Sequence, residues 1–168
     1  MLIEFNYLAH KYNFRPKGVL HIGANRGEEA NAYHNLKAEK VYWIEALPAM
    51  FLKLKGNVSK YPNQYAFNFC VGDEHDKEVV FHVANNDSQS SSLLELGTHK
   101  EAHPEVKYSY DVKLKMVRID KIGLNLEGFD FLNIDLQGAE LMALNGMGTE
   151  LERFKYPICL GLIPCCMN

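Results

Sequence analysis

The feature that most constrains the fold is a short, mainly apolar run followed at once by a glycine turn and a helix-forming segment. The run is residues 19–22, the turn is G-A-N-R-G from Gly23 to Gly27, and the segment E-E-A-N-A-Y-H-N-L follows. A run of this length that is bounded by glycine is typical of a buried strand. The sequence therefore predicts a strand, a tight turn and a helix.

The same unit recurs along the first half of the chain. Residues 41–44 form a second buried-type run that ends at Glu45, and a helix opened by proline is expected over about residues 48–58. A third strand is expected over residues 65–71, before Gly72. Because strands alternate with helices at this spacing, we expect an α/β fold with a mostly parallel sheet and right-handed crossovers.

The rest of the chain extends this pattern. An amphipathic helix is expected within residues 1–17, and the polar loop N-N-D-S-Q-S-S-S is expected to help shape a binding site. Further along the chain we expect an extra strand over residues 78–83, a strand over 113–122 and a buried strand over 129–135. A helix is expected to start with residues 138–144 and to be closed by Gly146 and Gly148, and a last strand is expected over 156–163.

Composition limits the classes of protein to which the chain can belong. With 168 residues, 47% of them apolar, one domain over residues 1–168 is expected. The net charge of -3 and the lack of a dense basic run argue against nucleic acid as a partner. No signal peptide or membrane span is expected, so we predict a cytoplasmic protein. The four cysteines form neither a disulfide framework nor a zinc motif, and we expect reduced thiols.

The candidate site lies at the carboxyl ends of the expected strands, where open α/β sheets bind their ligands. Gly23 and Gly27 would let the backbone turn tightly and approach a ligand. Glu45, at the end of the second strand, could accept hydrogen bonds from the ribose hydroxyls of an adenosine. The plain alternative is that the glycines only make a turn and that Glu45 is solvated.

The glycine turn does not match a dinucleotide-binding site. It lacks the G-x-G-x-x-G pattern that packs a pyrophosphate on a helix, and Glu28 and Glu29 follow it directly. Carboxylates at this place would repel a pyrophosphate and would tolerate a cationic ligand. The pattern therefore favours a sulfonium cofactor over NAD.

Several motifs together resemble the FkbM-type methyltransferases. Residues 19–27 match the pattern V-x-x-x-G-A-N-x-G, and D-L-Q-G-A-E at 135–140 matches D-x-Q/E-G-x-E at the family's fourth strand. Residues 43–48 are similar to its second strand, 90–94 to its serine-rich loop and 117–120 to its V-x-x-x-D strand. The resemblance covers roughly residues 15–150 and implies a Rossmann-like class I methyltransferase sheet in a three-layer αβα arrangement.

The resemblance also implies S-adenosyl-L-methionine as cofactor and a set of residues that bind it. Gly23, Ala24, Asn25 and Gly27 of the turn would line the methionine moiety. Glu45 would bind the ribose, and Val71 with Gly72 would lie near the adenine. Asp135 and Gln137 would face the methyl-transfer centre. His21 stands where many family members have an acidic residue. The expected cofactor-binding set is His21, Gly23, Ala24, Asn25, Gly27, Glu45, Ala46, Val71, Gly72, Asp135 and Gln137.

The family further suggests an O-methyltransferase that acts on a hydroxyl of a small-molecule or glycan-like acceptor. A hydroxyl is a weak nucleophile at neutral pH, so a base is required. Asp135 is the first candidate, ahead of Asp120 and His82, although Asp135 could instead cap the next helix and His82 could be structural. His99 and His103 do not form the H-E-x-x-H pattern, and no metal is expected.

The end of the chain, residues 151–168, departs from the family pattern. The sequence stops in P-I-C-L-G-L-I-P-C-C-M-N, where the family continues through further strands, and we interpret this end as atypical or truncated. An exposed strand edge there would allow a homo-oligomer. Two alternatives stay open: a cofactor-binding or assembly module without activity, and, less favoured by the glycine pattern, an NAD-dependent oxidoreductase.

Overall fold

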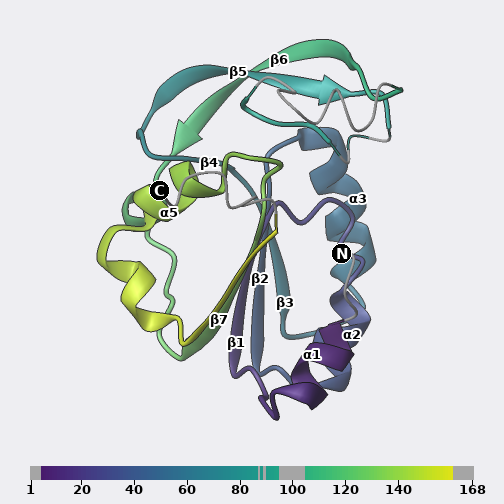
Figure 1. Cartoon of the computed structure of the whole chain (residues 1–168), viewed down its shortest axis with the longest axis vertical. Coiled ribbons are helices and arrows are strands. Elements are labelled where there is room, and N and C mark those ends of the chain that lie inside the picture. Colours follow the sequence, from purple (N-terminus) through teal and green to yellow (C-terminus); the bar gives the residue numbers. More distant parts are fainter. Residues whose placement is uncertain (1–4, 87, 89, 95–104, 161–168) are drawn as a thin grey trace, which may run out of the picture.

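A central parallel sheet of five strands forms the core of the fold. The computed structural model describes residues 5–86, 88, 90–94 and 105–160. The strand order is β3-β2-β1-β7-β8, and every neighbouring pair is parallel (Figure 1). The strands are β1 (Gly18–Ile22), β2 (Lys40–Glu45), β3 (Gln64–Asn68), β7 (Phe129–Asp135) and β8 (Tyr156–Leu160). The expected α/β fold with a parallel sheet is confirmed.

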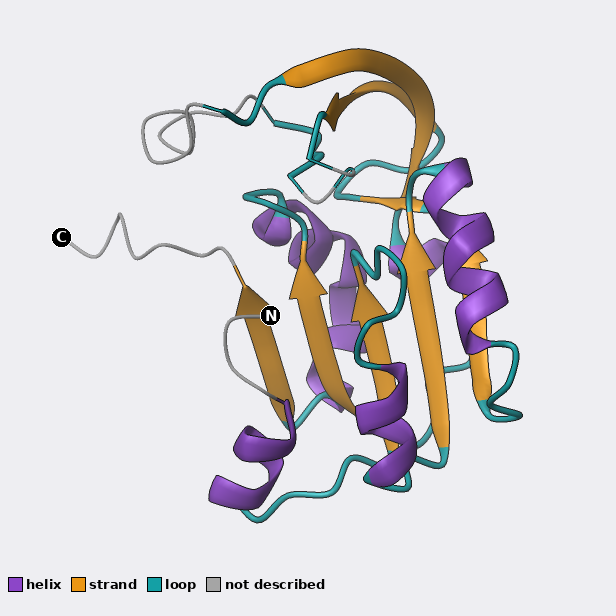
Figure 2. Ribbon diagram, turned by 90° about the vertical axis from the view of Figure 1, so that its right-hand side faces the viewer, coloured by secondary structure: helices purple, strands orange, loops and turns teal. Residues whose placement is uncertain are grey.

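Helices cover both faces of this sheet and complete the three layers (Figure 2). On one face lie α1 (Phe5–Lys11), α2 (Ala30–Asn35) and α3 (Pro48–Val58). On the other lie the 3-10 turns η1 (Ile119–Lys121) and η2 (Gly148–Arg153), with α5 (Glu140–Met147).

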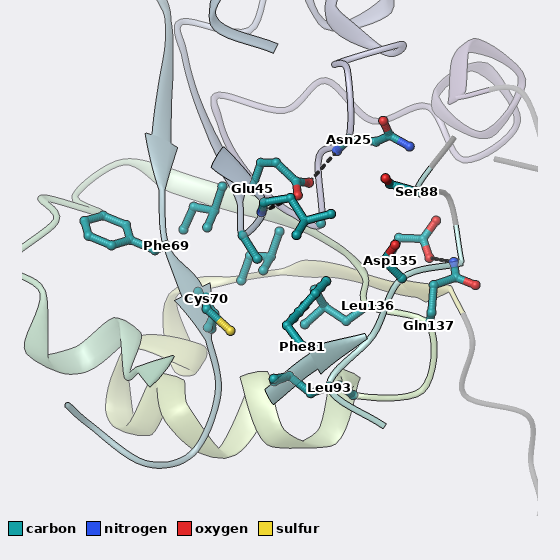
Figure 3. Close-up of a pocket in the computed structure, with 18 residues that line it drawn as sticks. Asn25, Glu45, Phe69, Cys70, Phe81, Ser88, Leu93, Asp135, Leu136 and Gln137 are labelled. Carbon is teal, nitrogen blue, oxygen red and sulfur yellow. Dashed lines mark hydrogen bonds between the residues drawn. The ribbon is translucent and has the colours of Figure 1, made fainter. Parts of the chain in front are cut away.

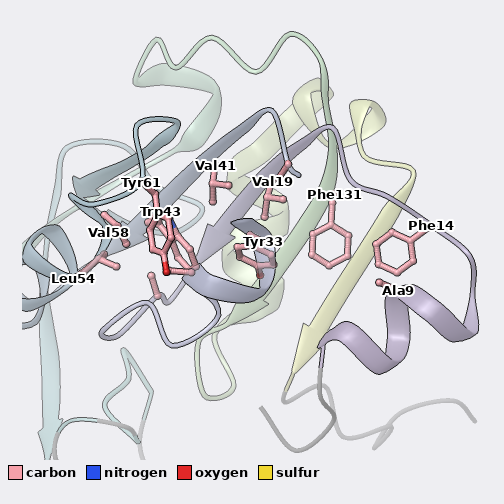
Figure 4. Close-up of a cluster of buried hydrophobic side chains, with 13 residues drawn as sticks. Ala9, Phe14, Val19, Tyr33, Val41, Trp43, Leu54, Val58, Tyr61 and Phe131 are labelled. Carbon is pink, nitrogen blue, oxygen red and sulfur yellow. The ribbon is translucent and has the colours of Figure 1, made fainter. Parts of the chain in front are cut away.

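Each face of the sheet has its own core because side chains alternate along a strand. On β1, Val19 packs toward the first group of helices, whereas Leu20 and Ile22 pack toward the second. Figure 4 shows the first core, in which Trp43 and Phe131 lie against the α2 side chain Tyr33.

A second, smaller sheet lies beyond the carboxyl ends of the central strands (Figure 1). Its order is β4-β6-β5, with β4 (Cys70–Val71) parallel to β6 (Tyr108–Val117) and β5 (Lys77–Ala84) antiparallel to it. Phe81 and Val83 of β5 pack on Leu47 and Met50 at the start of α3. Through this packing the second sheet covers one end of the central sheet.

Some boundaries differ from the sequence-based predictions for local reasons. The strand expected over 65–71 was wrong as one element, because the chain leaves the central sheet after Asn68 and joins the second sheet as β4. The strand expected over 113–122 begins earlier, at Tyr108, and ends at Val117, since Ile119–Lys121 forms a 3-10 turn. Of the last expected strand, 156–160 is observed, and 161–163 lies outside the described residues.

Candidate functional site

A pocket opens at the point where the strand order reverses, between β1 and its neighbours β2 and β7. Its walls come from the carboxyl ends of the central strands, the second sheet and the polar loop after β5 (Figure 3). The lining residues are Ile22, Gly23, Asn25, Ile44, Glu45, Ala46, Leu47, Phe69, Cys70, Val71, Phe81, Ser88, Ser91, Leu93, Asp135, Leu136, Gln137 and Ala139.

The β1–α2 turn brings the ends of β1 and β7 into close contact. Gly23 has φ +82°, and a Cβ atom at this residue would lie 1.9 Å from the carbonyl oxygen of Asp135. The amide of Gly23 donates to the carbonyl oxygen of Ile44, at 3.0 Å, so the turn is fixed to β2 as well. Only glycine combines this backbone conformation with this approach, and the turn is therefore held against both neighbouring strands.

Glu45 joins two walls of the pocket through its carboxylate. Oε2 accepts a hydrogen bond from the amide of Asn25, and Oε1 accepts one from the amide of Leu47, each at 2.9 Å. The residue is 8% exposed, and burial raises the pKa of its carboxyl to about 7, against the opposing effect of these amides. Each oxygen keeps a second lone pair, so the group can still accept from a ligand.

We expect the unliganded protein to lose stability as the pH rises from about 5 to about 8. Glu45 has a native pKa of about 7 against an ordinary value of 4.5, so the folded state binds its proton more tightly than the unfolded state does. This proton-linked stability is complete below the unfolded pKa and is lost as the pH rises through the native one, for Glu45 by at most ~3 kcal/mol.

Urea denaturation at several pH values measures this loss. Glu45→Gln cannot titrate, so its free energy of unfolding should depend less on pH over this range. An equal slope in the variant and the wild type would contradict the assignment to Glu45.

Asp135 ends β7 at the opposite side of the pocket from the β4 residues. Its Oδ1 accepts a hydrogen bond from Nε2 of Gln137 at 2.6 Å, and burial raises the pKa of its carboxyl to about 6. The fully buried Glu140, rather than Asp135, accepts the hydrogen bonds from the loop amides of Leu136 and Gly138. Within the described residues no hydrogen bond from an α5 amide to Asp135 is found, so its carboxylate faces the pocket without capping that helix.

Polar and apolar groups separate within the pocket. In Figure 3 Asn25, Ser88, Asp135 and Gln137 gather on one side, and Phe69 with Cys70 lies on the other. A ligand with a polar end and an aromatic end would match this division.

The sequence-based site included only two of the apolar side chains that line the pocket, Ala46 and Val71, and it missed Phe69, Cys70 and Phe81. Phe69 and Cys70 lie where the chain passes from the central sheet to the second sheet, and Phe81 lies on β5 of the second sheet, whose packing over the pocket has no local signal in the sequence. The polar loop was recognised, and it does reach the pocket: Ser88 and Ser91 line it. Oγ of Ser92 donates to the carbonyl oxygens of Leu136 and Gln137, at 3.3 and 3.2 Å.

The predicted residues divide between the pocket and its surroundings. Gly23, Asn25, Glu45, Ala46, Val71, Asp135 and Gln137 line the pocket. Ala24, Gly27 and Gly72 lie behind it: Ala24 is buried, and a Cβ on Gly27 or Gly72 would meet Leu54 or Met116. Within the glycine turn, Gly23 and Asn25 therefore line the pocket, whereas Ala24 and Gly27 do not.

His21 lies one layer below the pocket, inside the core. Its Nδ1 is hydrogen-bonded to the hydroxyl of Tyr33 at 3.1 Å, and its ring stacks on Trp43. Burial lowers its pKa to about 3, so the ring is neutral at physiological pH.

The other two base candidates also lie away from the pocket lining. Both oxygens of Asp120 accept hydrogen bonds from Arg118, which lowers the pKa of this carboxyl. His82 follows the pocket-lining Phe81 and so points to the opposite face of β5, where its ring stacks on Tyr108 and its Nδ1 lies 2.7 Å from Asp111.

Two further expectations concern metals and membranes. Within the described ranges there is no group of three or more His, Cys, Asp or Glu side chains that could hold a metal ion. His99 and His103 lie outside those ranges. Among the described helices, none has both the length and the apolar character that a membrane crossing requires.

A parallel sheet of this order, with a pocket at its strand-order reversal and an acidic residue ending β2, defines a Rossmann-like nucleotide- or cofactor-binding class. The family model for the methyltransferase FkbM domain matches residues 21–162, a span that contains the whole pocket. The chain belongs to the FkbM methyltransferase family, which confirms the resemblance found in the sequence motifs. No curated protein and no solved structure matches the chain.

Proposed function

We propose that this methyltransferase uses S-adenosyl-L-methionine and transfers the methyl group to a hydroxyl of a small-molecule or glycan-like acceptor. The observation that carries the proposal is that the ionisable carboxyl groups in the described pocket lining are not balanced by a basic side chain. Glu45 and Asp135 line the pocket, and no Lys or Arg is found among its described lining residues. Such a lining favours a ligand with a positive centre and disfavours the pyrophosphate of NAD.

The residues of the pocket fit the shape and polarity of this cofactor. Glu45 has lone pairs left for the ribose hydroxyls, and the apolar side around Phe69, Cys70 and Phe81 suits an adenine ring. Oδ1 of Asn25 is buried without a hydrogen-bond partner in the described structure, which suits a ligand with donor groups. When bound, the cofactor supplies a methyl group activated by its sulfonium centre.

Asp135 is the residue that we propose as general base. Its carboxyl lies in the pocket, and its pKa of about 6 leaves it mostly ionised at neutral pH yet closer to that pH than an ordinary aspartate. Base catalysis is most effective when the pKa lies near the working pH. Gln137 would hold this carboxylate in place through the hydrogen bond to Oδ1.

The cofactor proposal is tested by Glu45→Ala with S-adenosylhomocysteine, the demethylated product, in isothermal titration calorimetry. We expect affinity to fall by ~1 to 3 kcal/mol, because charge-assisted hydrogen bonds to the ribose and the anchoring of Asn25 are both lost. Glu39→Ala is a matched control, since Glu39 is an exposed glutamate just before the other end of β2.

Unchanged affinity in Glu45→Ala would remove this residue from the site, and wild-type binding of NAD in place of S-adenosylhomocysteine would refute the cofactor. Methyl transfer is then assayed with a set of hydroxylated small molecules and oligosaccharides. Cofactor binding without transfer to any of them would favour the binding or assembly module instead. Size-exclusion chromatography with light scattering measures the oligomeric state.

A further inference from the structure

The loop between β7 and α5 contains the residue that binds the proposed base. Gln137 donates from Nε2 to Oδ1 of Asp135, at 2.6 Å (Figure 3). Its backbone has φ +53°, in the left-handed region, although it carries a side chain. A residue other than glycine is unfavourable there and keeps this conformation only where the surrounding contacts enforce it. The contacts of this loop therefore help to fix the position of the Asp135 carboxylate.

Two side chains from different elements hold this loop. From α5, the buried carboxylate of Glu140 accepts hydrogen bonds from the amides of Leu136 and Gly138. From the polar loop after β5, the hydroxyl of Ser92 shares its one proton between the carbonyl oxygens of Leu136 and Gln137, at 3.3 and 3.2 Å. Glu140 thus binds the amides of the loop, and Ser92 binds its carbonyl groups.

Ser92 is itself fixed in place by the second sheet. It is 2% exposed, and its backbone pairs with His82 of β5 in both directions: its amide donates at 3.1 Å, and its carbonyl oxygen accepts at 2.9 Å. Its Oγ also accepts a hydrogen bond from the amide of Leu94, at 3.1 Å. Because its backbone is anchored on β5, the hydroxyl of Ser92 joins the second sheet to the loop that carries Gln137.

We propose that Ser92 is a positioning residue for methyl transfer, which keeps Gln137 in the conformation that binds the Asp135 carboxylate. The inference rests on the proposed function, because Asp135 is the base proposed there. It adds a residue that is not among those lining the pocket and that acts on the base through Gln137.

This link has a measurable electrostatic consequence. The hydrogen bond from Gln137 lowers the pKa of Asp135, against the larger effect of burial. On the described elements, the other carboxylates that act on Asp135 or line the same pocket are those of Glu140, Glu29 and Glu45. Ser92→Ala leaves all of these groups in the chain, so a higher pKa of Asp135 in this variant would report the release of Gln137.

NMR titration of ¹³C-labelled aspartate carboxyl groups measures this pKa, with the Asp135 signal assigned by its loss in Asp135→Asn. We expect Ser92→Ala to raise the pKa of Asp135 by about one pH unit, the effect of losing a hydrogen bond to a charged group. Gln137→Ala should raise it by a similar amount. The double variant should show no further rise, because Ser92 acts through Gln137.

Kinetics on the same variants connect the pKa to the reaction. Ser92→Ala should lower kcat by about tenfold, because the base is present but less well placed, and should leave affinity for S-adenosylhomocysteine within about twofold. Ser92→Thr keeps the hydroxyl and should restore most of the lost kcat. Ser59→Ala is the matched control: Oγ of Ser59 also donates to a backbone carbonyl oxygen, that of Gly56, but at the exposed end of α3, and neither the pKa nor kcat should change.

Thermal unfolding verifies that each variant is folded, and Ser92→Cys, similar in size and a weak donor, replaces Ser92→Ala if alanine is not tolerated. An unchanged Asp135 pKa or an unchanged kcat in Ser92→Ala would overturn the inference, as would a further rise in the double variant. The titration needs neither cofactor nor acceptor. Protein that shows the linked pKa but transfers no methyl group would therefore refute the proposed function and leave the link from Ser92 to Asp135 in place.

Discussion

Replacing Asp135 by asparagine is expected to lower kcat for methyl transfer by about 10²- to 10⁴-fold, the usual contribution of a positioned general base. The asparagine oxygen can still accept the hydrogen bond from Gln137, so the geometry at the end of β7 should persist. Affinity for S-adenosylhomocysteine should change by less than about tenfold, because the change removes a charge and retains the shape. Steady-state kinetics and calorimetry on the same variant separate the two effects.

The pH profile gives an independent measurement of the same residue. In the wild type kcat should rise with pH through an apparent pKa close to the value of about 6 for Asp135, because only the ionised form accepts a proton. The rise should vanish in Asp135→Asn. A variant that retained most of its activity, with the same pH profile, would show that another group is the base.

The second large effect is expected for Gly23→Ala, which should lose about 3 kcal/mol of stability or more. Alanine at φ +82° costs ~1 to 2 kcal/mol. Its Cβ would also lie 1.9 Å from the carbonyl oxygen of Asp135, a backbone overlap that forces β1 and β7 apart. Since domains have only ~5 to 15 kcal/mol of net stability, much of the folded population should be lost.

Gly56→Ala is the matched control for this substitution. Gly56 lies inside α3, and a Cβ there would meet nothing within 4 Å. Alanine at a free helical position should therefore stabilise the protein by ~0.5 to 1 kcal/mol. Urea denaturation followed by circular dichroism compares the two variants, and equal stabilities would contradict the proposed close approach at Gly23.

Much of the central sheet could be predicted because its signals are local. Residues 48–58 form the expected helix, and 129–135 the expected strand, with the predicted bounds. Proline at the start of the helix and a continuous apolar run in the strand act over a few residues, so no distant contact is needed to interpret them. The glycine turn after β1 was recognisable for the same reason.

The boundaries of the second sheet could not be predicted in the same way. The sequence from 65 to 71 is suited to one strand, but the side chain of Asn68 donates to the carbonyl oxygens of Glu45 and Ala46 where the chain leaves the central sheet. Residues 70–71 then pair with β6, more than forty positions later. Such pairing depends on distant residues meeting in space, and strand propensity carries no information about it.

The direction in which a side chain points could not be predicted from the sequence either. The sequence placed His21, Asp120 and His82 among the candidates by residue type and position. The structure turns His21 into the core and His82 to the far face of its strand, and it pairs Asp120 with Arg118. Residue type indicates what chemistry a side chain can perform, whereas the strand on which it lies and the parity of its position decide what it contacts.

The order of residues along the chain by itself determined the parallel α/β class, the glycine turn, the acidic end of β2 and the family, because each is encoded within a short segment. The tertiary structure alone decided which of these groups share a pocket, that Glu45 joins two of its walls, and that Ser92 binds the loop after β7. Burial, distance and pairing arise only when segments far apart in the chain pack together, and these quantities set the charge and basicity of the site.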